Sequence, residues 1–247
     1  MVFKLFIFLL FFIKSSYAHE LRPAIANLNI YEKDNIINAT LSIQLNLEAI
    51  IAEINMNHSN TKKSKESDQY ENLRTMSAIE LLKKFNSKIR TLQNKIYLTS
   101  SNTNYSLVLL NVDIPEVGNT DMIRDTIIKF DIKDIKDEDL KFSWEKNLGS
   151  IILRVNSKDN KDLYSKLVES GEESDWFSIT NKREESLIDN IKSYIQLGFK
   201  HIIPKGLDHI LFVLALFLLS SRLKPLILQV SIFTLAHTIT LFLGALD

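Results

Sequence analysis

The carboxyl-terminal part of the chain carries almost no charge. From Gly206 to Asp247 the only formal charges are Asp208, Arg222, Lys224 and Asp247, although the whole chain has 30 basic and 30 acidic residues among 247. Such an apolar stretch has to be covered by lipid or by protein. We expect a membrane region at 199–247 with two transmembrane helices, at about 204–221 and 226–246.

A basic turn gives this region an orientation. Arg222 and Lys224 lie in the short turn between the two predicted helices, without an acidic residue beside them. By the positive-inside rule the turn should be cytoplasmic, so the preceding part of the chain lies outside. Residues 184–198 predict an amphipathic juxtamembrane helix, which could rest on the lipid headgroups or pack on the preceding domain.

The first 18 residues resemble a secretory signal peptide. Lys4 precedes an uninterrupted apolar run, and Ser16 and Ala18 are the small residues that cleavage before His19 requires. We therefore expect residues 19–183 to be exported. We predict an integral protein of a bacterial inner membrane, with this domain on the periplasmic side.

Strict alternation of apolar and polar residues dominates this exported domain. Ile37 to Glu48 is the longest such run, and shorter runs surround Phe130, Phe142 and Leu153. Residues 95–99 and 105–114 read as a hairpin. The fold class that follows is a β-rich, sandwich-like antiparallel domain. Its one helical insertion, at about 70–94, is indicated by apolar residues at intervals of three to five.

Composition narrows the function classes. Balanced charge without a basic cluster argues against nucleic acid as a partner. The chain has no cysteine, and it contains neither a phosphate-binding glycine loop nor a nucleophile elbow. We expect no enzyme activity and no tightly bound cofactor.

Ionisable residues in the predicted membrane region are its strongest functional signal. The group comprises three imidazoles and one carboxylate, from His201, Asp208, His209 and His237. These are side chains that bind divalent nickel, cobalt, zinc or iron. Plainer roles stay open: a helix-start carboxylate for Asp208, an interfacial histidine for His201, and an interhelical hydrogen bond for His237. Counted from the outer boundary, His237 lies ~15 Å deep and Asp208 ~6 to 8 Å, at 1.5 Å per residue. This depth difference favours a stepwise path for an ion over a shared coordination shell.

The segment from Gly198 to Val213, together with Leu223-Lys224-Pro225 and the run from Phe233 to Leu241, resembles the HupE/UreJ family of hydrogenase- and urease-associated membrane proteins. The mature start from His19 to Ala24 is also similar to members with an exported domain. The resemblance implies a permease or accessory protein for Ni²⁺ or Co²⁺. It implies metal-handling roles for His201, Asp208 and His209.

The chain departs from the family pattern in two respects. Six residues separate His201 from Asp208 where nickel-permease members have five, and the family has about six membrane helices where two are predicted here. We therefore expect a truncated product. Its partners would be the lipid bilayer, a divalent metal ion, and either further copies of itself or a separately encoded remainder of the helical bundle.

The new amino terminus is a further candidate ligand. Cleavage before His19 would place an α-amino group beside its imidazole, a chelating pair that suits copper or nickel. The alternative is that His19 only follows the cleavage site.

Two other functions compete with metal transport. His237 with His209 or His201 could supply the axial ligands of a b-type haem. Alternatively, the membrane helices only anchor an exported binding module.

Overall fold

A computed structural model describes residues 22–57, 65–120, 122–157, 162–181, 207–219 and 223–244, and five residues between 191 and 199. Within the last two helical segments, the described side chains are those of residues 210–218 and 224–240. The chain divides into two compact units, residues 1–183 and 184–247. The predicted signal peptide lies outside the described residues and stays a prediction.

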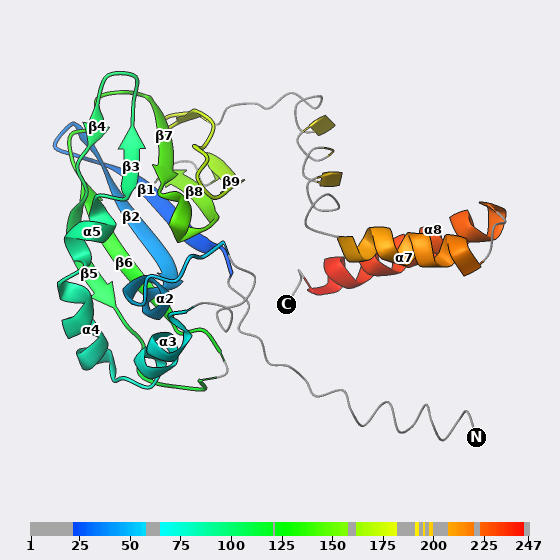
Figure 1. Cartoon of the computed structure of the whole chain (residues 1–247). Coiled ribbons are helices and arrows are strands. Elements are labelled where there is room, and N and C mark those ends of the chain that lie inside the picture. Colours follow the sequence, from blue (N-terminus) through cyan, green and yellow to red (C-terminus); the bar gives the residue numbers. More distant parts are fainter. Residues whose placement is uncertain are drawn as a thin grey trace. The chain divides into compact units, whose positions relative to one another are not determined.

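The first unit is built from two sheets (Figure 1). The larger sheet has the order β5(Val108–Asp113), β6(Asp125–Ile132), β2(Ile36–Asn46), β1(Ala24–Lys33), β8(Ile151–Ser157), β9(Tyr164–Val168). The smaller sheet has the order β10(Phe177–Ser178), β7(Asp139–Trp144), β3(Ile96–Thr99), β4(Asn104–Tyr105).

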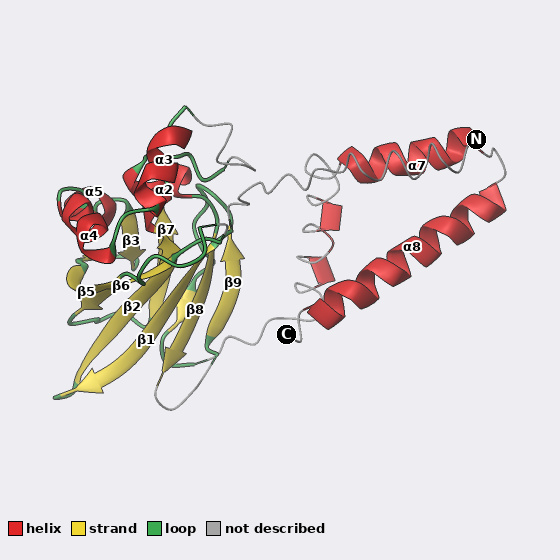
Figure 2. Ribbon diagram, turned by 90° about the horizontal axis from the view of Figure 1, so that it is seen from below, coloured by secondary structure: helices red, strands yellow, loops and turns green. Residues whose placement is uncertain are grey.

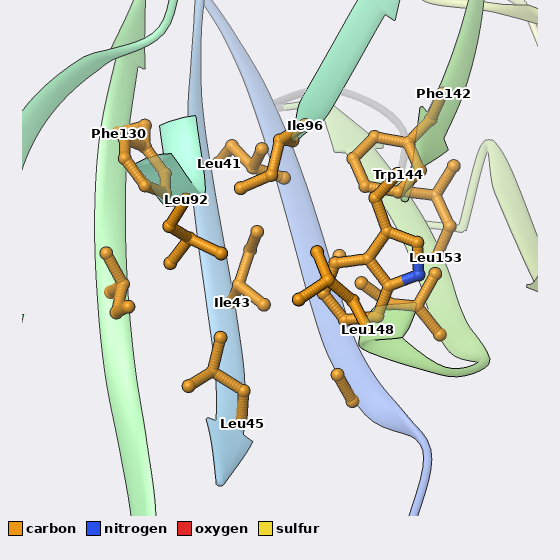
Figure 3. Packing of buried hydrophobic residues seen from close by; sticks show 14 of the residues in the cluster. Leu41, Ile43, Leu45, Leu92, Ile96, Phe130, Phe142, Trp144, Leu148 and Leu153 are labelled. Carbon is orange, nitrogen blue, oxygen red and sulfur yellow. The ribbon is translucent and has the colours of Figure 1, made fainter. Parts of the chain in front are cut away.

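Alternation along the strands decides which residues form the core. In β2, Leu41, Ile43 and Leu45 are buried, while the residues between them are half-buried on the other face. Figure 3 shows these side chains in one cluster with Phe142 and Trp144 of the smaller sheet. The β-rich character predicted from the sequence is therefore present, with the core between the two sheets.

One strand pair departs from the predicted antiparallel arrangement. β1 pairs with β2 in antiparallel fashion, but it pairs with β8 in parallel, with Ala24 opposite Ile151. A parallel pair needs a long crossover connection. Here most of the domain forms that crossover.

The prediction of one continuous helix at 70–94 is wrong. The structure has three helices there, α3(Ser67–Arg74), α4(Ala78–Asn86) and α5(Ile89–Gln93), and a short α2(Leu47–Ile51) precedes them. These helices gather along one side of the sheets (Figure 2). The chain is interrupted because Ser77 begins a new helix: its hydroxyl accepts from the Glu80 amide, and the Glu80 carboxylate accepts from the Ser77 amide.

The predicted strand at 105–114 is divided between the two sheets. Tyr105 pairs with Leu98 in the smaller sheet, whereas Val108 lies opposite Asp131 in the larger one. The Tyr105 hydroxyl donates to Asp137 Oδ2 across 2.9 Å. One alternating pattern therefore covers two strands that belong to different layers.

A buried polar network ties the loop at 114–124 to the helices. Arg124 donates from Nε to Glu48 Oε1 across 2.7 Å and from Nη1 to the Met76 carbonyl across 3.0 Å. In the other direction, Arg74 donates from Nη2 to the carbonyls of Thr120 and Met122. Arg124 thus binds a backbone carbonyl near Arg74, and Arg74 binds backbone carbonyls near Arg124.

Tyr70 lies beside this network. Its hydroxyl accepts a hydrogen bond from Asn46 Nδ2 at 2.8 Å, and the Arg74 guanidinium lies 5.4 Å from its ring centroid. Burial raises the pKa of the Tyr70 hydroxyl, while the Asn46 hydrogen bond and the Arg74 charge act in the opposite direction. The net shift is upward because desolvation is the largest of these effects.

The predicted α-helical transmembrane region is wrong. The second unit contains α7(Leu207–Leu219) and α8(Leu223–Gly244), and no helix among the described residues combines the length and apolarity needed to cross a membrane.

Candidate functional site

The predicted metal ligands are distributed unevenly over the described residues. Asp208 and His209 occupy the second and third positions of α7, but their side chains lie outside the described part. His237 lies in α8, and its side chain is exposed. His19 and His201 lie outside the described residues, so their roles stay predictions.

An aromatic row connects α7 to His237. The ring of Phe212 in α7 lies 4.9 Å from that of Phe233 in α8, with an angle of 37° between the planes. The Phe233 ring in turn lies parallel to the His237 imidazole, at 6.2 Å between centroids and 5° between planes. Sequence reasoning missed both phenylalanines because each is one of many apolar residues in its helix.

Threonine hydroxyls near His237 bond within α8. Thr240 donates to the His237 carbonyl at 2.8 Å, Thr234 to the Val230 carbonyl at 2.9 Å, and Thr238 to the Thr234 carbonyl at 2.9 Å. This back-bonding satisfies these donors locally. It leaves the imidazole as the chemically distinctive group of this stretch of α8.

An apolar cavity of about 530 Å³ lies between α7 and α8. It is lined by Ile210, Phe212, Val213, Leu214, Phe217, Leu226, Val230, Phe233 and Thr234. Thr234 is the only polar residue of this lining, and its hydroxyl already donates to Val230. The described lining of the cavity therefore offers no free polar group for an ion.

The described side chains alone do not form a metal centre. Across the ranges for which side chains are described, no three His, Asp or Glu residues lie close enough to hold an ion. The predicted set in the second unit consists of His237 together with residues whose side chains are outside that part, namely His201, Asp208 and His209. Imidazole and carboxylate are the donors that Ni²⁺, Co²⁺ and Zn²⁺ accept.

Comparison with known families places the candidate residues in a matched segment. Residues 178–247 match the family described as HupE / UreJ protein, and this segment contains α7, α8 and the predicted ligands His201, Asp208, His209 and His237. The match covers less than a third of the chain. The resemblance to the HupE/UreJ family is thereby confirmed for this segment. No curated protein matches the chain.

Proposed function

We propose that this chain binds a divalent transition metal, Ni²⁺ or Co²⁺, and transfers it as an accessory or permease-like protein of the HupE/UreJ type. The observation that carries the proposal is the family match over residues 178–247, which contains four of the five predicted ligands. A nickel- or cobalt-related role is what this family suggests. The finer assignment to particular residues rests on their chemistry.

Transfer through these residues would proceed by ligand exchange. Neutral imidazole nitrogens and a carboxylate bind first-row dications reversibly, so an incoming ligand can replace one already bound. The reaction needs no covalent intermediate and no redox step. Asp208 would provide the anionic ligand, and His209 and His237 would provide nitrogen ligands.

The surfaces of α7 and α8 support membrane association of this activity. Large apolar side chains are exposed in the described parts of both helices, among them Leu211, Leu218, Ile227 and Leu235. Exposed apolar side chains in this number require a cover, either lipid or another protein. We infer that lipid covers much of this surface, in keeping with a family of membrane proteins.

The first unit would serve as an attached domain with a separate fold. Its core is closed by its own two sheets, and the buried side chains of Arg74 and Arg124 bind loop and helix carbonyls. We propose that it interacts with other proteins or delivers the ion, while the second unit provides the predicted ligands.

A binding measurement tests the proposal. The full-length purified chain is dialysed against Ni²⁺, Co²⁺ and Zn²⁺, and the bound metal is quantified by mass spectrometry. We expect about one bound ion per chain and at least a tenfold loss of affinity in Asp208→Asn/His209→Gln. Thr238→Val is the matched control, because the Thr238 hydroxyl bonds only within α8 among the contacts described.

Two results would count against the proposal. A wild-type chain that retains none of the three ions would leave an attached domain without metal chemistry. Retention of full affinity by the double variant would exclude Asp208 and His209 as ligands, and would direct attention to His19.

A further inference from the structure

A cavity of about 110 Å³ lies in the first unit, at the end of the two sheets where β2 passes into α2. It is bordered by the start of β1, the end of β2, the start of β6, the end of β7 and the short 3₁₀ helix η2(Lys146–Leu148). About 10–15 Å³ is enough for one water molecule, so the cavity has room for a small organic molecule.

The inner wall of this cavity is apolar. Leu45, Trp144 and Leu148 line it, and each of them is at most 7% exposed. Figure 3 shows all three in the core cluster. The indole N–H of Trp144 already donates to the Gly149 carbonyl at 2.8 Å, so the ring offers a ligand only its carbon surface. A ligand would therefore place an apolar group against this wall.

Asn46 is the buried polar residue of the lining, and its side chain is already engaged. Its Oδ1 accepts from the Ala49 amide at 3.1 Å, and its Nδ2 donates to the Tyr70 hydroxyl at 2.8 Å. Both ends of the side-chain amide are thus used to hold α2 and α3. Polar recognition of a ligand has to come from the outer residues of the lining.

Two opposite charges belong to this outer part. Arg22 and Asp125 both line the cavity and are both exposed. Within the described residues, neither side chain forms an ion pair or a hydrogen bond, so the two charges do not neutralise each other. In the larger sheet β2 lies between β1 and β6, which places these two strands about 10 Å apart. This spacing leaves room for a small ligand that carries both charges.

The chemistry of each charged group narrows the class of ligand. A guanidinium group presents two parallel N–H donors that match a planar carboxylate. A carboxylate accepts hydrogen bonds from a primary ammonium group, whereas a quaternary ammonium group has none to donate. A ligand with both groups at one end and a few apolar carbons at the other is an α-amino acid.

We propose that this cavity binds a free α-amino acid with a short aliphatic side chain. Arg22 binds the α-carboxylate, Asp125 binds the α-ammonium group, and the aliphatic side chain packs against Leu45, Trp144 and Leu148. All of these residues belong to the first unit. The inference therefore goes beyond the metal chemistry proposed for the second unit and does not depend on it.

Fluorescence of Trp144 provides a direct test of entry into the cavity. The chain has two tryptophans, and Trp176→Phe leaves Trp144 as the single one. Trp176 is outside the cavity lining, with the Lys141 ammonium 5.1 Å from its ring centroid. Titration of the full-length Trp176→Phe chain with L-valine should change the emission of Trp144 in a saturable manner. Calorimetric titration of the wild type should give about one L-valine per chain, and the absence of saturable binding there would overturn the proposal.

Two analogues of L-valine test the recognition of both charges. Isobutylamine lacks the carboxylate, and isovalerate lacks the ammonium group. Each loses one charge-assisted hydrogen-bonding group, so we expect each to bind the wild type about tenfold more weakly or worse. An affinity equal to that of L-valine for either analogue would show that the missing charge is not recognised.

Substitution of the charged residues assigns the two roles. Arg22→Gln should lose the preference for L-valine over isobutylamine, and Asp125→Asn should lose the preference over isovalerate. A general disturbance of the domain would not divide the two preferences between the two variants. Arg154→Gln, on the exposed face of β8, and Asp34→Asn, in the turn at the other end of β1 and β2, are the matched controls. Loss of either preference in a control, or its retention in both Arg22→Gln and Asp125→Asn, would refute the assignment.

The titrations are made in the presence of a chelator, because amino acids bind Ni²⁺ themselves. Saturable L-valine binding by a chain that retains no metal would keep this inference and refute the proposed function. Normal Ni²⁺ binding by a chain that does not bind L-valine would keep the proposed function and refute this site.

Discussion

Arg124 donates a hydrogen bond from Nε to Oε1 of Glu48 across 2.7 Å, and the two side chains are only 9% and 1% exposed. The other carboxylate oxygen of Glu48 has no hydrogen-bond partner within the described residues. The pair is therefore costly to separate, since either partner alone would be a buried and uncompensated charge.

Replacing Arg124 by Met should destabilise the first unit by about 3–5 kcal/mol, because Glu48 then stays buried without its cation. Urea unfolding of the full-length chain, followed by circular dichroism, measures this change. The double variant Glu48→Met/Arg124→Met should recover most of the loss. Lys88→Met is the control, because its ion pair with the mostly exposed Glu53 should contribute at most about 1 kcal/mol. A smaller loss in Arg124→Met than in Lys88→Met would contradict the prediction.

Ser77→Ala should cost about 1 kcal/mol, since it removes the side-chain acceptor at the start of α4. The unfolding midpoint in urea reports the change, and Ser77→Asp should restore most of it. Ser87→Ala is the matched control at the other end of the same helix, where the Ser87 hydroxyl donates to the Lys84 carbonyl. An equal effect of both alanine variants would show that the capping box has no special role.

Gly149→Ala should lower the free energy of unfolding of the first unit by about 1–3 kcal/mol. Gly149 has φ +83°, and an added Cβ would lie 2.8 Å from Met56 Cβ. Its carbonyl also accepts from Trp144 Nε1 at 2.8 Å, so a shift of the backbone would disturb the core. Thermal unfolding of the full-length chain measures the change. Gly118→Ala is the control and should be close to neutral, because nothing lies within 4 Å of the added carbon.

Stability should fall in alkaline solution through Tyr70. Burial raises the pKa of its hydroxyl, so the folded state prefers the neutral form. This contribution is complete below the unfolded pKa of about 10 and is lost as the pH rises through the higher folded value. Urea unfolding between pH 8 and 11 should show a steeper decline for the wild type than for Tyr70→Phe. An identical slope in both would exclude Tyr70 as the cause, and Tyr97→Phe serves as the matched control.

Sequence periodicity predicted the strands whose two faces differ. Leu41 and Ile43 alternate with polar residues because β2 has the core on one side, and this local pattern was sufficient to find the strand. The end of the strand was not predictable in this way. Glu48 continued the alternation as a polar position, yet it belongs to α2 and is buried against Arg124. That contact joins residues 76 positions apart in the chain, so no local pattern contains it.

The helices were harder to predict for a related reason. The apolar spacing from Leu73 to Leu92 is compatible with one helix, but the cap at Ser77 starts a new one. In the candidate site, the chemical character of Asp208, His209 and His237 indicated metal binding. Phe233, whose ring lies parallel to that of His237, contacts Phe212 of the other helix, and this tertiary contact has no signature in the sequence.

The position of β1 has a consequence for how the first unit is made. β1 is an interior strand whose two neighbours are β2, which follows at once, and β8, which starts at Ile151. While the chain emerges from its amino-terminal end, one edge of β1 stays without its partner until nearly the whole domain has been synthesised. Completion of the sheet is therefore a late event, and any factor that shields a nascent strand edge would protect this protein during that interval.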